Sequence, residues 1–223
     1  MMNYMMDLFT RILKRLPLAQ YPYKPFMIKH KCIFLHIPKN AGTSILTAFD
    51  DEGVRRHIPW IHFHRANSAR FKQYFKFTVI REPISRLYSA YNYLLNGGNQ
   101  SSDDLALSEY IKQNSKDFNS FIMNVLCSDL IMQHELLWPQ YLFIYDRQLN
   151  LKVDKVLKLE SLASDWHCFA KQKGFPIDLP FENKSDVNRA GQQLDLINIL
   201  NSSAKNKISD LYHNDFKLLK YTM

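Results

Sequence analysis

Two strongly apolar stretches, each followed by a run compatible with a helix, give the chain its clearest pattern. Residues 32–37 (CIFLHI) and 75–80 (FKFTVI) are apolar and β-prone, which is the profile of buried parallel strands. A helix-compatible run starts at about residue 43, and a second starts at Pro83, where a helix favours its first residue. The pattern therefore predicts two strand-turn-helix units.

The remaining sequence repeats this alternation of short apolar runs with helical stretches. The predicted further elements are strands at 140–145 and 155–159, and helices over 43–52, 83–96, 103–126, 161–173 and 203–219. A hydrophobic fraction of 46% in 223 residues is enough for one sizeable core. We therefore expect an α/β fold, a single-domain P-loop-type three-layer arrangement in which a mostly parallel sheet is flanked by helices.

The first predicted strand ends in a short loop, Lys39-Asn-Ala-Gly-Thr-Ser44, whose residue types favour an anion. Backbone N–H groups of such a loop and of the following helix start form a concave set of donors, and Gly42 lets the backbone approach a ligand closely. Lys39 adds a point charge, and Thr43 and Ser44 add hydroxyl donors. The general Walker pattern is absent, because the lysine precedes the glycine.

The second predicted strand ends in a comparable group, Arg81-Glu-Pro followed by Arg86, Ser89 and Tyr91. Arg81 should project from the carboxyl end of the strand, where its planar fork suits phosphate oxygens. Ser89 lies two helical turns beyond Pro83 and could share that anion, whereas Arg86 could equally be an ordinary charge on the helix surface. Together the two motifs predict two separated phosphate-type sites on one nucleotide at the carboxyl ends of the strands.

HIPKNAGTS followed by VIREPISRLYSAY resembles the two cofactor motifs of the Golgi-type carbohydrate sulfotransferases, which use 3′-phosphoadenosine 5′-phosphosulfate (PAPS). The resemblance implies that the 5′-phosphosulfate is held by the first motif, which comprises Lys39, Asn40, Ala41, Gly42, Thr43 and Ser44. It implies that Arg81 and Ser89 hold the 3′-phosphate, and it places Lys184 in a C-terminal cofactor loop. The departures from the family pattern are Asn40 for Thr, Glu82 for Asp and Phe181 for His. On this basis residues 31–223 form the sulfotransferase domain, and residues 1–30 form a basic and hydrophobic N-terminal extension.

Sulfuryl transfer needs a base for the acceptor hydroxyl and a cation near the departing phosphate. Lys39 is the candidate for the cation, because charge builds up on the bridging oxygen in the transition state. His62 and His64 are candidates for the base, since alternation by two would place both imidazoles on one face of a strand-like segment. The 2-O-sulfotransferases carry a similar H-x-H with a catalytic histidine, which favours His64 as base and His62 as support.

Other interpretations of these residues remain open. The histidine pair could be structural or could ligate a metal, although no third ligand stands at an obvious spacing, and no metal is expected. A rival base is one of the three carboxylates that follow the loop, Asp50, Asp51 and Glu52, whose ordinary role is a solvated helix end.

The net charge of +8 and a pI near 9.3 indicate anionic partners. PAPS is one such partner, and an acidic carbohydrate acceptor is the other that we expect. No nucleic-acid-binding motif is present, so binding of nucleic acid is not expected. The sequence does not predict an oligomeric state.

Three cysteines without C-x-x-C spacing favour reduced thiols and a cytoplasmic location. The sequence contains no apolar run of about 18 residues that would span a membrane. The mixed basic and hydrophobic stretch Met1–Leu18 could lie on a membrane surface as an amphipathic helix, or pack on its own domain or a partner.

The function expected from these observations is transfer of a sulfuryl group from PAPS to a hydroxyl of a carbohydrate, without a metal. The alternatives are a P-loop small-molecule kinase and a catalytically inactive module that binds a nucleotide or polyanion.

Overall fold

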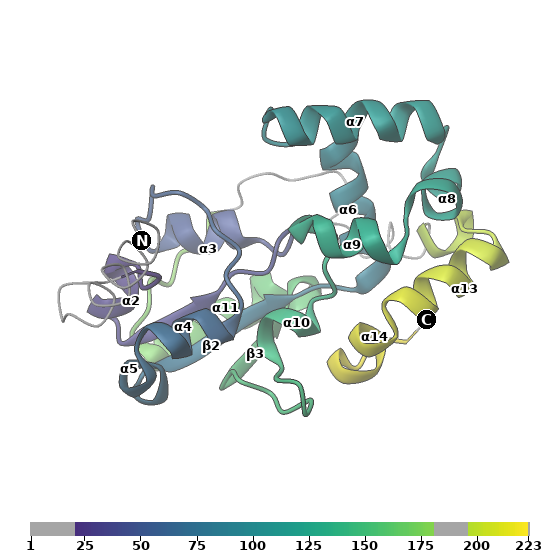
Figure 1. The fold of residues 1–223 in the computed structure, drawn as a ribbon. Coiled ribbons are helices and arrows are strands. Elements are labelled where there is room, and N and C mark those ends of the chain that lie inside the picture. Colours follow the sequence, from purple (N-terminus) through teal and green to yellow (C-terminus); the bar gives the residue numbers. More distant parts are fainter. Residues whose placement is uncertain (1–20, 181–195, 223) are drawn as a thin grey trace, which may run out of the picture.

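A three-stranded parallel sheet forms the centre of the fold in the computed structural model, which describes residues 21–180 and 196–222 (Figure 1). The strands are β1 (Cys32–Leu35), β2 (Phe75–Ile80) and β3 (Lys155–Lys158), in the order β1-β2-β3. Phe34 of β1 lies opposite Phe77 of β2, and all four residues of β1 are buried. The sheet confirms the parallel α/β architecture predicted from the apolar runs.

Helices make up most of the remaining described chain. The α-helices are α2 (Pro25–Lys29), α3 (Gly42–Ala48), α4 (Trp60–Ala66), α5 (Ser68–Gln73), α6 (Pro83–Leu95), α7 (Ser102–Asn114), α8 (Phe118–Ser120), α9 (Ser128–Gln133), α10 (Tyr141–Ile144), α11 (Leu162–Lys173), α13 (Ser202–Leu211) and α14 (His213–Leu219). The shorter helical turns are η1 (Phe121–Val125), η2 (Glu135–Leu137) and η3 (Leu159–Ser161).

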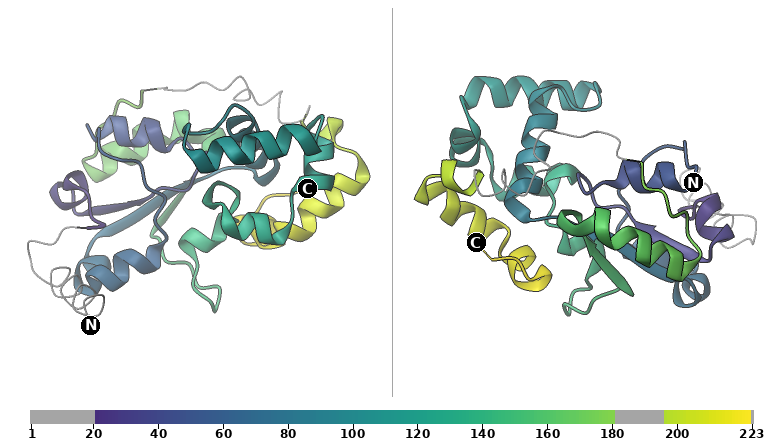
Figure 2. Two further views of the ribbon diagram at one scale, coloured as in Figure 1. Left: turned by 45° about the horizontal axis from the view of Figure 1, so that its top comes forward. Right: turned by 180° about the vertical axis from the view of Figure 1, so that it is seen from behind.

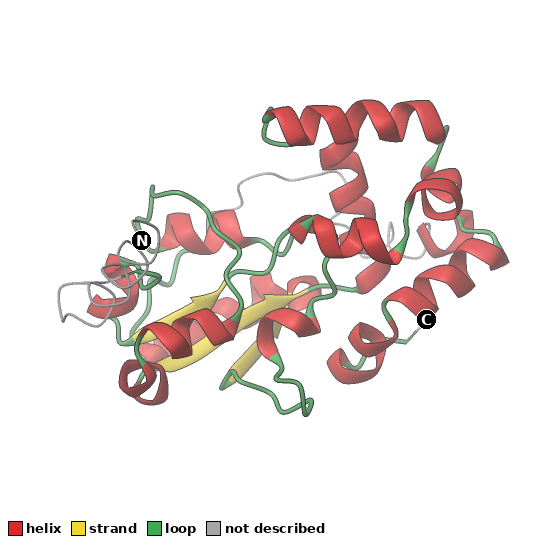
Figure 3. Ribbon diagram, viewed as in Figure 1, coloured by secondary structure: helices red, strands yellow, loops and turns green. Residues whose placement is uncertain are grey.

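The helices form layers on both sides of the sheet. Figure 2 shows α3 and α11 on one face and α4 and α5 on the other, so that the strands in Figure 3 are enclosed between helices. The helices α6, α7, α8, α9, α13 and α14 gather beyond the carboxyl ends of the strands (Figure 1). This arrangement encloses the edge of the sheet at which both predicted anion motifs end.

Buried apolar residues form two clusters that follow this division. One cluster surrounds the sheet and includes Phe34, Phe77 and Trp166. The second lies among the helices beyond the strand ends and includes Leu87 and Phe121. Both motifs therefore lie between two packed regions, which restricts how far their backbones can move.

The start of α6 shows how the sequence positions the second motif. The side chain of Glu82 accepts hydrogen bonds from the backbone N–H groups of Ile84 (2.9 Å) and Ser85 (2.7 Å), and Pro83 is the first helical residue. These contacts satisfy donors that a helix start leaves open. The helix thus begins at Pro83, as predicted.

The strand predicted at 140–145 is wrong, because Tyr141–Ile144 form the helix α10. The carboxylate of Asp215 accepts hydrogen bonds from the backbone N–H groups of Gln140 (2.8 Å) and Tyr141 (2.9 Å) and so caps this turn from the C-terminal part of the chain. A short apolar run cannot be distinguished from a buried helical turn by periodicity alone. The deciding interaction is 75 residues distant in sequence.

Replacing Asp215 with Asn should destabilise the protein. Asp215 is fully buried, and each of its oxygens accepts one backbone N–H. The Asn side chain would turn one acceptor into a donor and leave a buried N–H unpaired, at a cost of about 1–3 kcal/mol in the free energy of unfolding. Urea unfolding measures this change, and an unchanged midpoint would contradict the role given to Asp215.

Two of the long predicted helices are interrupted in the structure. The helix predicted over 103–126 ends at Asn114, and Asp117 then caps the short helix α8 by accepting from the N–H of Ser120 at 2.7 Å. The helix predicted over 203–219 is divided at Tyr212, whose buried hydroxyl donates to the carbonyl of Leu137 at 2.8 Å. In both places the chain turns so that apolar side chains pack into the second cluster of buried residues, among the helices beyond the strand ends.

Part of the predicted N-terminal extension packs against the sheet. Residues 21–30 include the helix α2, and Tyr23, Phe26 and Met27 are buried in the sheet cluster. The predicted amphipathic stretch Met1–Leu18 lies outside the described residues, as do Phe181 and Lys184. Within the described ranges, no helix has the length and apolar character that a membrane span requires.

Candidate active site

The loop between β1 and α3 is folded as an open set of backbone donors. Lys39 and Ala41 adopt left-handed backbone conformations, with φ of 67° and 54°. Among the described residues, no acceptor is hydrogen-bonded to the backbone N–H groups of residues 39–44. Unpaired N–H groups in a turned loop are suited to an anion, which would satisfy several of them together.

Gly42 is required because a histidine ring lies directly over it. A Cβ added at Gly42 would come within 1.7 Å of Nε2 of His36, and within 2.0 Å of the next ring atom. His36 is buried and stacks on Phe34, with ring centroids 5.7 Å apart. The imidazole and the loop therefore occupy adjoining positions, and a larger residue at 42 would push them apart.

Gly42→Ala should impair both folding and anion binding. The added methyl group overlaps the His36 ring, and overpacking of this kind costs about 1–3 kcal/mol. We expect a lower thermal midpoint and weaker binding of adenosine 3′,5′-bisphosphate by calorimetry. Unchanged binding would mean that the loop can move away from His36 without losing its shape.

The side chain of Lys39 is partly buried and lies close to two other cationic side chains. Its Nζ atom is 4.1 Å from the ring centroid of Tyr93. Burial, together with the charges of Arg81 and Arg86, lowers the pKa of Lys39 to about 8. The ammonium is thus held where it lacks a negative partner among the described residues, and a bound anion would stabilise it.

This environment gives Lys39 a measurable effect on stability. The pKa of Lys39 in the unfolded chain is about 10.4, which is higher than in the folded protein. Between about pH 8 and pH 10 the unfolded state therefore binds more protons than the folded state. The contribution of Lys39 to stability rises with pH over this range. We expect Lys39→Met to be more stable than the wild type at pH 7 without ligand, with the difference shrinking towards pH 10. Thermal unfolding of both proteins across this range checks the trend, and a difference independent of pH would contradict it.

Arg81 extends from the carboxyl end of β2 to the same loop. It is only 4% exposed, and its Nη1 lies 3.4 Å from the carbonyl oxygen of Lys39, which is a long hydrogen bond. Glu82 caps α6, and Glu160 accepts from the N–H of Glu82 and from the hydroxyl of Tyr221, so both nearby carboxylates have other donors. The structure thus brings Lys39 and Arg81 together while leaving Arg81 donors for a ligand.

Arg86 fastens the loop to the rest of the protein, so its interpretation as a helix-surface charge is wrong. Its guanidinium is 2% exposed and donates to the carbonyl groups of Pro38 (3.0 Å), Trp138 (2.8 Å) and Leu136 (3.2 Å). Helical periodicity could not show this burial, because the segment that covers α6 lies about 50 residues further along the chain. Arg86 is a structural residue that joins Pro38 to the 136–138 segment.

Asn40 and Gln140 join the two motifs beneath the loop. The Asn40 side chain is fully buried and donates to Val79 O (3.0 Å) and to Oε1 of Gln140 (2.7 Å). Gln140 also bonds the backbone of Arg81, accepting from its N–H at 3.0 Å and donating to its carbonyl at 2.7 Å. The Asn40 side chain therefore points away from the loop opening, and its backbone N–H is the group left for a ligand.

The hydroxyl residues of the motifs occupy different depths. Ser44 and Ser89 are buried, with 5% and 8% of their surface exposed, while Thr43 is partly exposed. Ser44 and Thr43 lie in the first turn of α3, and Ser89 lies on α6 in the same helix as Arg86. Their roles in cofactor binding remain predictions.

The strand-like face predicted for His62 and His64 is wrong, because both residues belong to the helix α4. Residues two apart on a helix point in nearly opposite directions. His62 is exposed, whereas the His64 ring packs against Trp60 and Phe71, with centroids 6.0 and 5.6 Å away. The two imidazoles do not form a joint pair, and whether either acts as the base remains a prediction.

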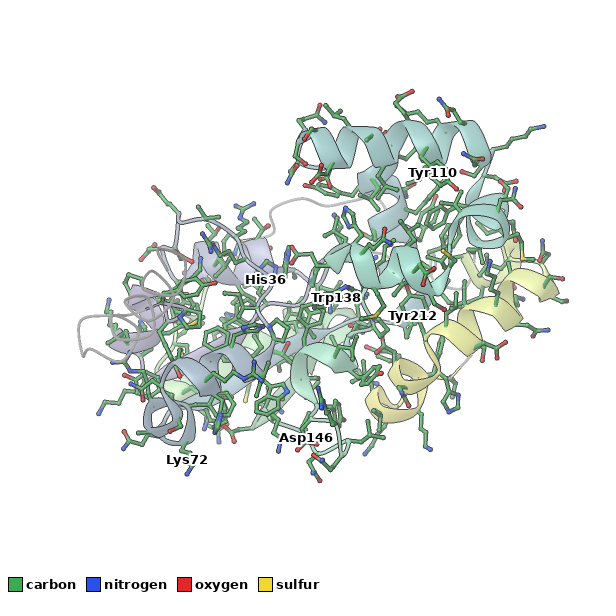
Figure 4. The ribbon with its side chains drawn as sticks, in the orientation of Figure 1. His36, Lys72, Tyr110, Trp138, Asp146 and Tyr212 are labelled. Carbon is green, nitrogen blue, oxygen red and sulfur yellow. The ribbon has the colours of Figure 1, made fainter. Side chains whose placement is uncertain are left out.

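Two other histidines lie beside the loop and were missed from the sequence. The rings of His36 and His57 are 4.5 Å apart, and Nδ1 of His57 is 2.7 Å from Oε1 of Glu135. Figure 4 shows His36 and Trp138 near the centre of the molecule. The available signal was the position of His36 inside the first motif, two residues before Pro38.

A cavity of about 330 Å³ adjoins this group. Its lining residues include Tyr23, Phe34, Phe63 and His36. Residues between 51 and 58, among them Arg56, form another part of its wall. Lys24 and Asp51 form an ion pair in the same wall. Asp51 is thus engaged by a cation, while Asp50 and Glu52 follow the end of α3 at Ala48.

The described part of the chain contains no cluster of three or more histidine, cysteine or carboxylate residues arranged to hold a metal ion.

Comparison with known proteins identifies the family of the chain. The chain matches the family described as "Sulfotransferase family" over residues 26–222. No curated protein and no solved structure was found to match it. The matched range contains the Lys39 loop, Arg81 and the Gln140 segment. This protein therefore belongs to the sulfotransferase family.

Proposed function

We propose that the protein transfers the sulfuryl group of PAPS to a hydroxyl of a carbohydrate and releases adenosine 3′,5′-bisphosphate. The observation that carries this proposal is the convergence of the two motifs, since Nη1 of Arg81 lies 3.4 Å from the carbonyl oxygen of Lys39. A donor molecule with anionic groups at two ends suits a site with two cationic side chains of this kind.

The groups around the loop fit the phosphosulfate end of PAPS. The unpaired N–H groups of residues 39–44 can donate to its oxygens, and Lys39 carries the positive charge. Arg81, with Ser89 as support, would hold the 3′-phosphate. Arg86 would not contact the donor, because its guanidinium is already bonded to three carbonyl groups.

Lys39 would act on the leaving group. As the S–O bond to the 5′-phosphate breaks, negative charge develops on the phosphate oxygen, and an ammonium there stabilises the transition state more than the ground state. The lowered pKa of Lys39, about 8, still leaves the side chain largely protonated at neutral pH.

The acceptor is proposed to be an acidic carbohydrate, such as a cell-surface polysaccharide or glycolipid. The net charge of +8 favours such a partner, and Arg55 and Arg56 are exposed on the segment that leads to His57. These cations would attract an anionic chain towards the loop.

The test is incubation with radiolabelled PAPS and fractionated cell-envelope or capsular glycans. We expect label in an acidic glycan fraction and release of the bisphosphate in equal amount. Tight binding of the bisphosphate without transfer to any fraction would favour an inactive binding module. Preferential binding of ATP with magnesium would favour a small-molecule kinase.

A further inference from the structure

Three side chains from separate parts of the chain form a row that ends at the loop of residues 39–44. Glu135 holds Nδ1 of His57 at 2.7 Å, and the His57 ring lies 4.5 Å from the His36 ring at an angle of 63°. Nε2 of His36 is the ring atom nearest the position that a Cβ on Gly42 would take. The row therefore runs from a carboxylate through two imidazoles to the loop.

The position of this row is fixed by the same contacts that fix the loop. Arg86 donates to the carbonyl groups of Pro38 and Leu136, so the residue next to Glu135 is linked to the residue that precedes Lys39. Glu135 in turn holds His57, which lies in the irregular segment after α3. The His57 side chain is 17% exposed and thus accessible to an acceptor.

Resting on the proposed function, we infer that His57, oriented by Glu135, takes the proton from the acceptor hydroxyl. A carboxylate on Nδ1 fixes the ring and leaves Nε2 as the nitrogen that can accept a proton. No described residue makes a hydrogen bond to Nε2 of His57, so none of these residues competes for the proton-accepting nitrogen.

The other histidines near the motifs are less suited to this task. His62 is exposed on α4, and His64 packs between Trp60 and Phe71. His36 is nearly fully buried, and burial together with His57 holds its pKa well below the usual range, so its ring stays neutral. His36, which packs against the His57 ring and lies next to Gly42, is therefore a positioning residue.

In the proposed step the acceptor oxygen forms a bond to the sulfur of PAPS as its proton passes to Nε2 of His57. The bond from sulfur to the 5′-phosphate oxygen breaks, and its electron pair stays on that phosphate, next to Lys39. The products are the sulfated acceptor, adenosine 3′,5′-bisphosphate and protonated His57. The proton is then released to solvent through the exposed part of the ring.

The test compares His57→Ala with His213→Ala, whose histidine is exposed at the start of α14. Transfer of label from PAPS to the acceptor glycan should fall about 100-fold or more in kcat for His57→Ala, with affinity for the bisphosphate retained. Added imidazole should restore part of the lost rate, which a purely structural role would not allow. His213→Ala should behave like the wild type.

Glu135→Gln tests whether Glu135 orients His57. It also provides a second variant in case His57→Ala does not fold. It should lower kcat, should not respond to imidazole, and should add little to the loss in the double variant, since the two residues act as a unit. Full activity of both single variants, or loss of activity in His64→Ala instead, would overturn the inference. A wild type that binds the bisphosphate but transfers no label would contradict the proposed function itself.

Discussion

Lys39→Ala should lower the turnover of the enzyme about 100- to 1,000-fold, which is the usual cost of removing one preorganised charge or donor from a transition state. The reason is that the ammonium is held beside the loop, 4.1 Å from the Tyr93 ring, where charge on the departing phosphate would develop. The backbone N–H groups and Arg81 remain in the variant, so affinity for the bisphosphate should fall much less. Steady-state kinetics and calorimetry separate the two effects.

The matched control is Lys72→Ala, which removes an exposed lysine from α5, next to the amino end of β2. It should leave turnover unchanged. If Lys39→Ala instead kept its turnover and lost only affinity, Lys39 would be a binding residue, and another group would have to stabilise the leaving phosphate.

Arg86→Leu should have the largest effect on stability. The substitution removes donors from two buried carbonyl groups and one partly buried carbonyl group, and it removes the positive charge that faces the buried carboxylate of Asp215. Losing one member of a buried charged network costs about 3–5 kcal/mol in the free energy of unfolding. Denaturant unfolding of the variant measures this loss directly.

Arg65→Leu provides the comparison, since Arg65 is exposed on α4 and its removal should change stability by about 0.5 kcal/mol or less. Equal effects of the two substitutions would show that the contacts of Arg86 contribute little. The loop would then have to be positioned by Asn40 and Gln140 alone.

The parallel sheet and the places of the two motifs could be predicted from local pattern. β1 and β2 are mainly apolar runs, β3 is a short β-prone run that holds Val156 and Leu157, and α6 starts with a proline and a capping carboxylate. Such features depend on neighbouring residues. By contrast, α10 depends on Asp215, so no local rule could distinguish it from a strand.

The two cationic residues that the structure brings together, Lys39 and Arg81, could be identified from the sequence, whereas the residues that support them could not. Lys39 and Arg81 carry charges whose chemistry is visible in the sequence. The burial of Arg86, the orientation of the Asn40 side chain and the contact of His57 with Glu135 depend on pairings across 39 to 100 residues. The H-x-H spacing was misleading because its segment is a helix, where alternation by two does not place side chains on one face.

Lys39 and Arg81 are proposed to bind the two ends of one bisphosphorylated nucleotide. Calorimetry with adenosine 3′,5′-bisphosphate and with adenosine 5′-phosphate, on the wild type, Lys39→Met and Arg81→Met, tests it most directly. We predict that Arg81→Met loses about 10- to 100-fold of the preference for the 3′-phosphate, while Lys39→Met keeps that preference. An Arg81→Met protein that still prefers the bisphosphate as strongly as the wild type would contradict the claim.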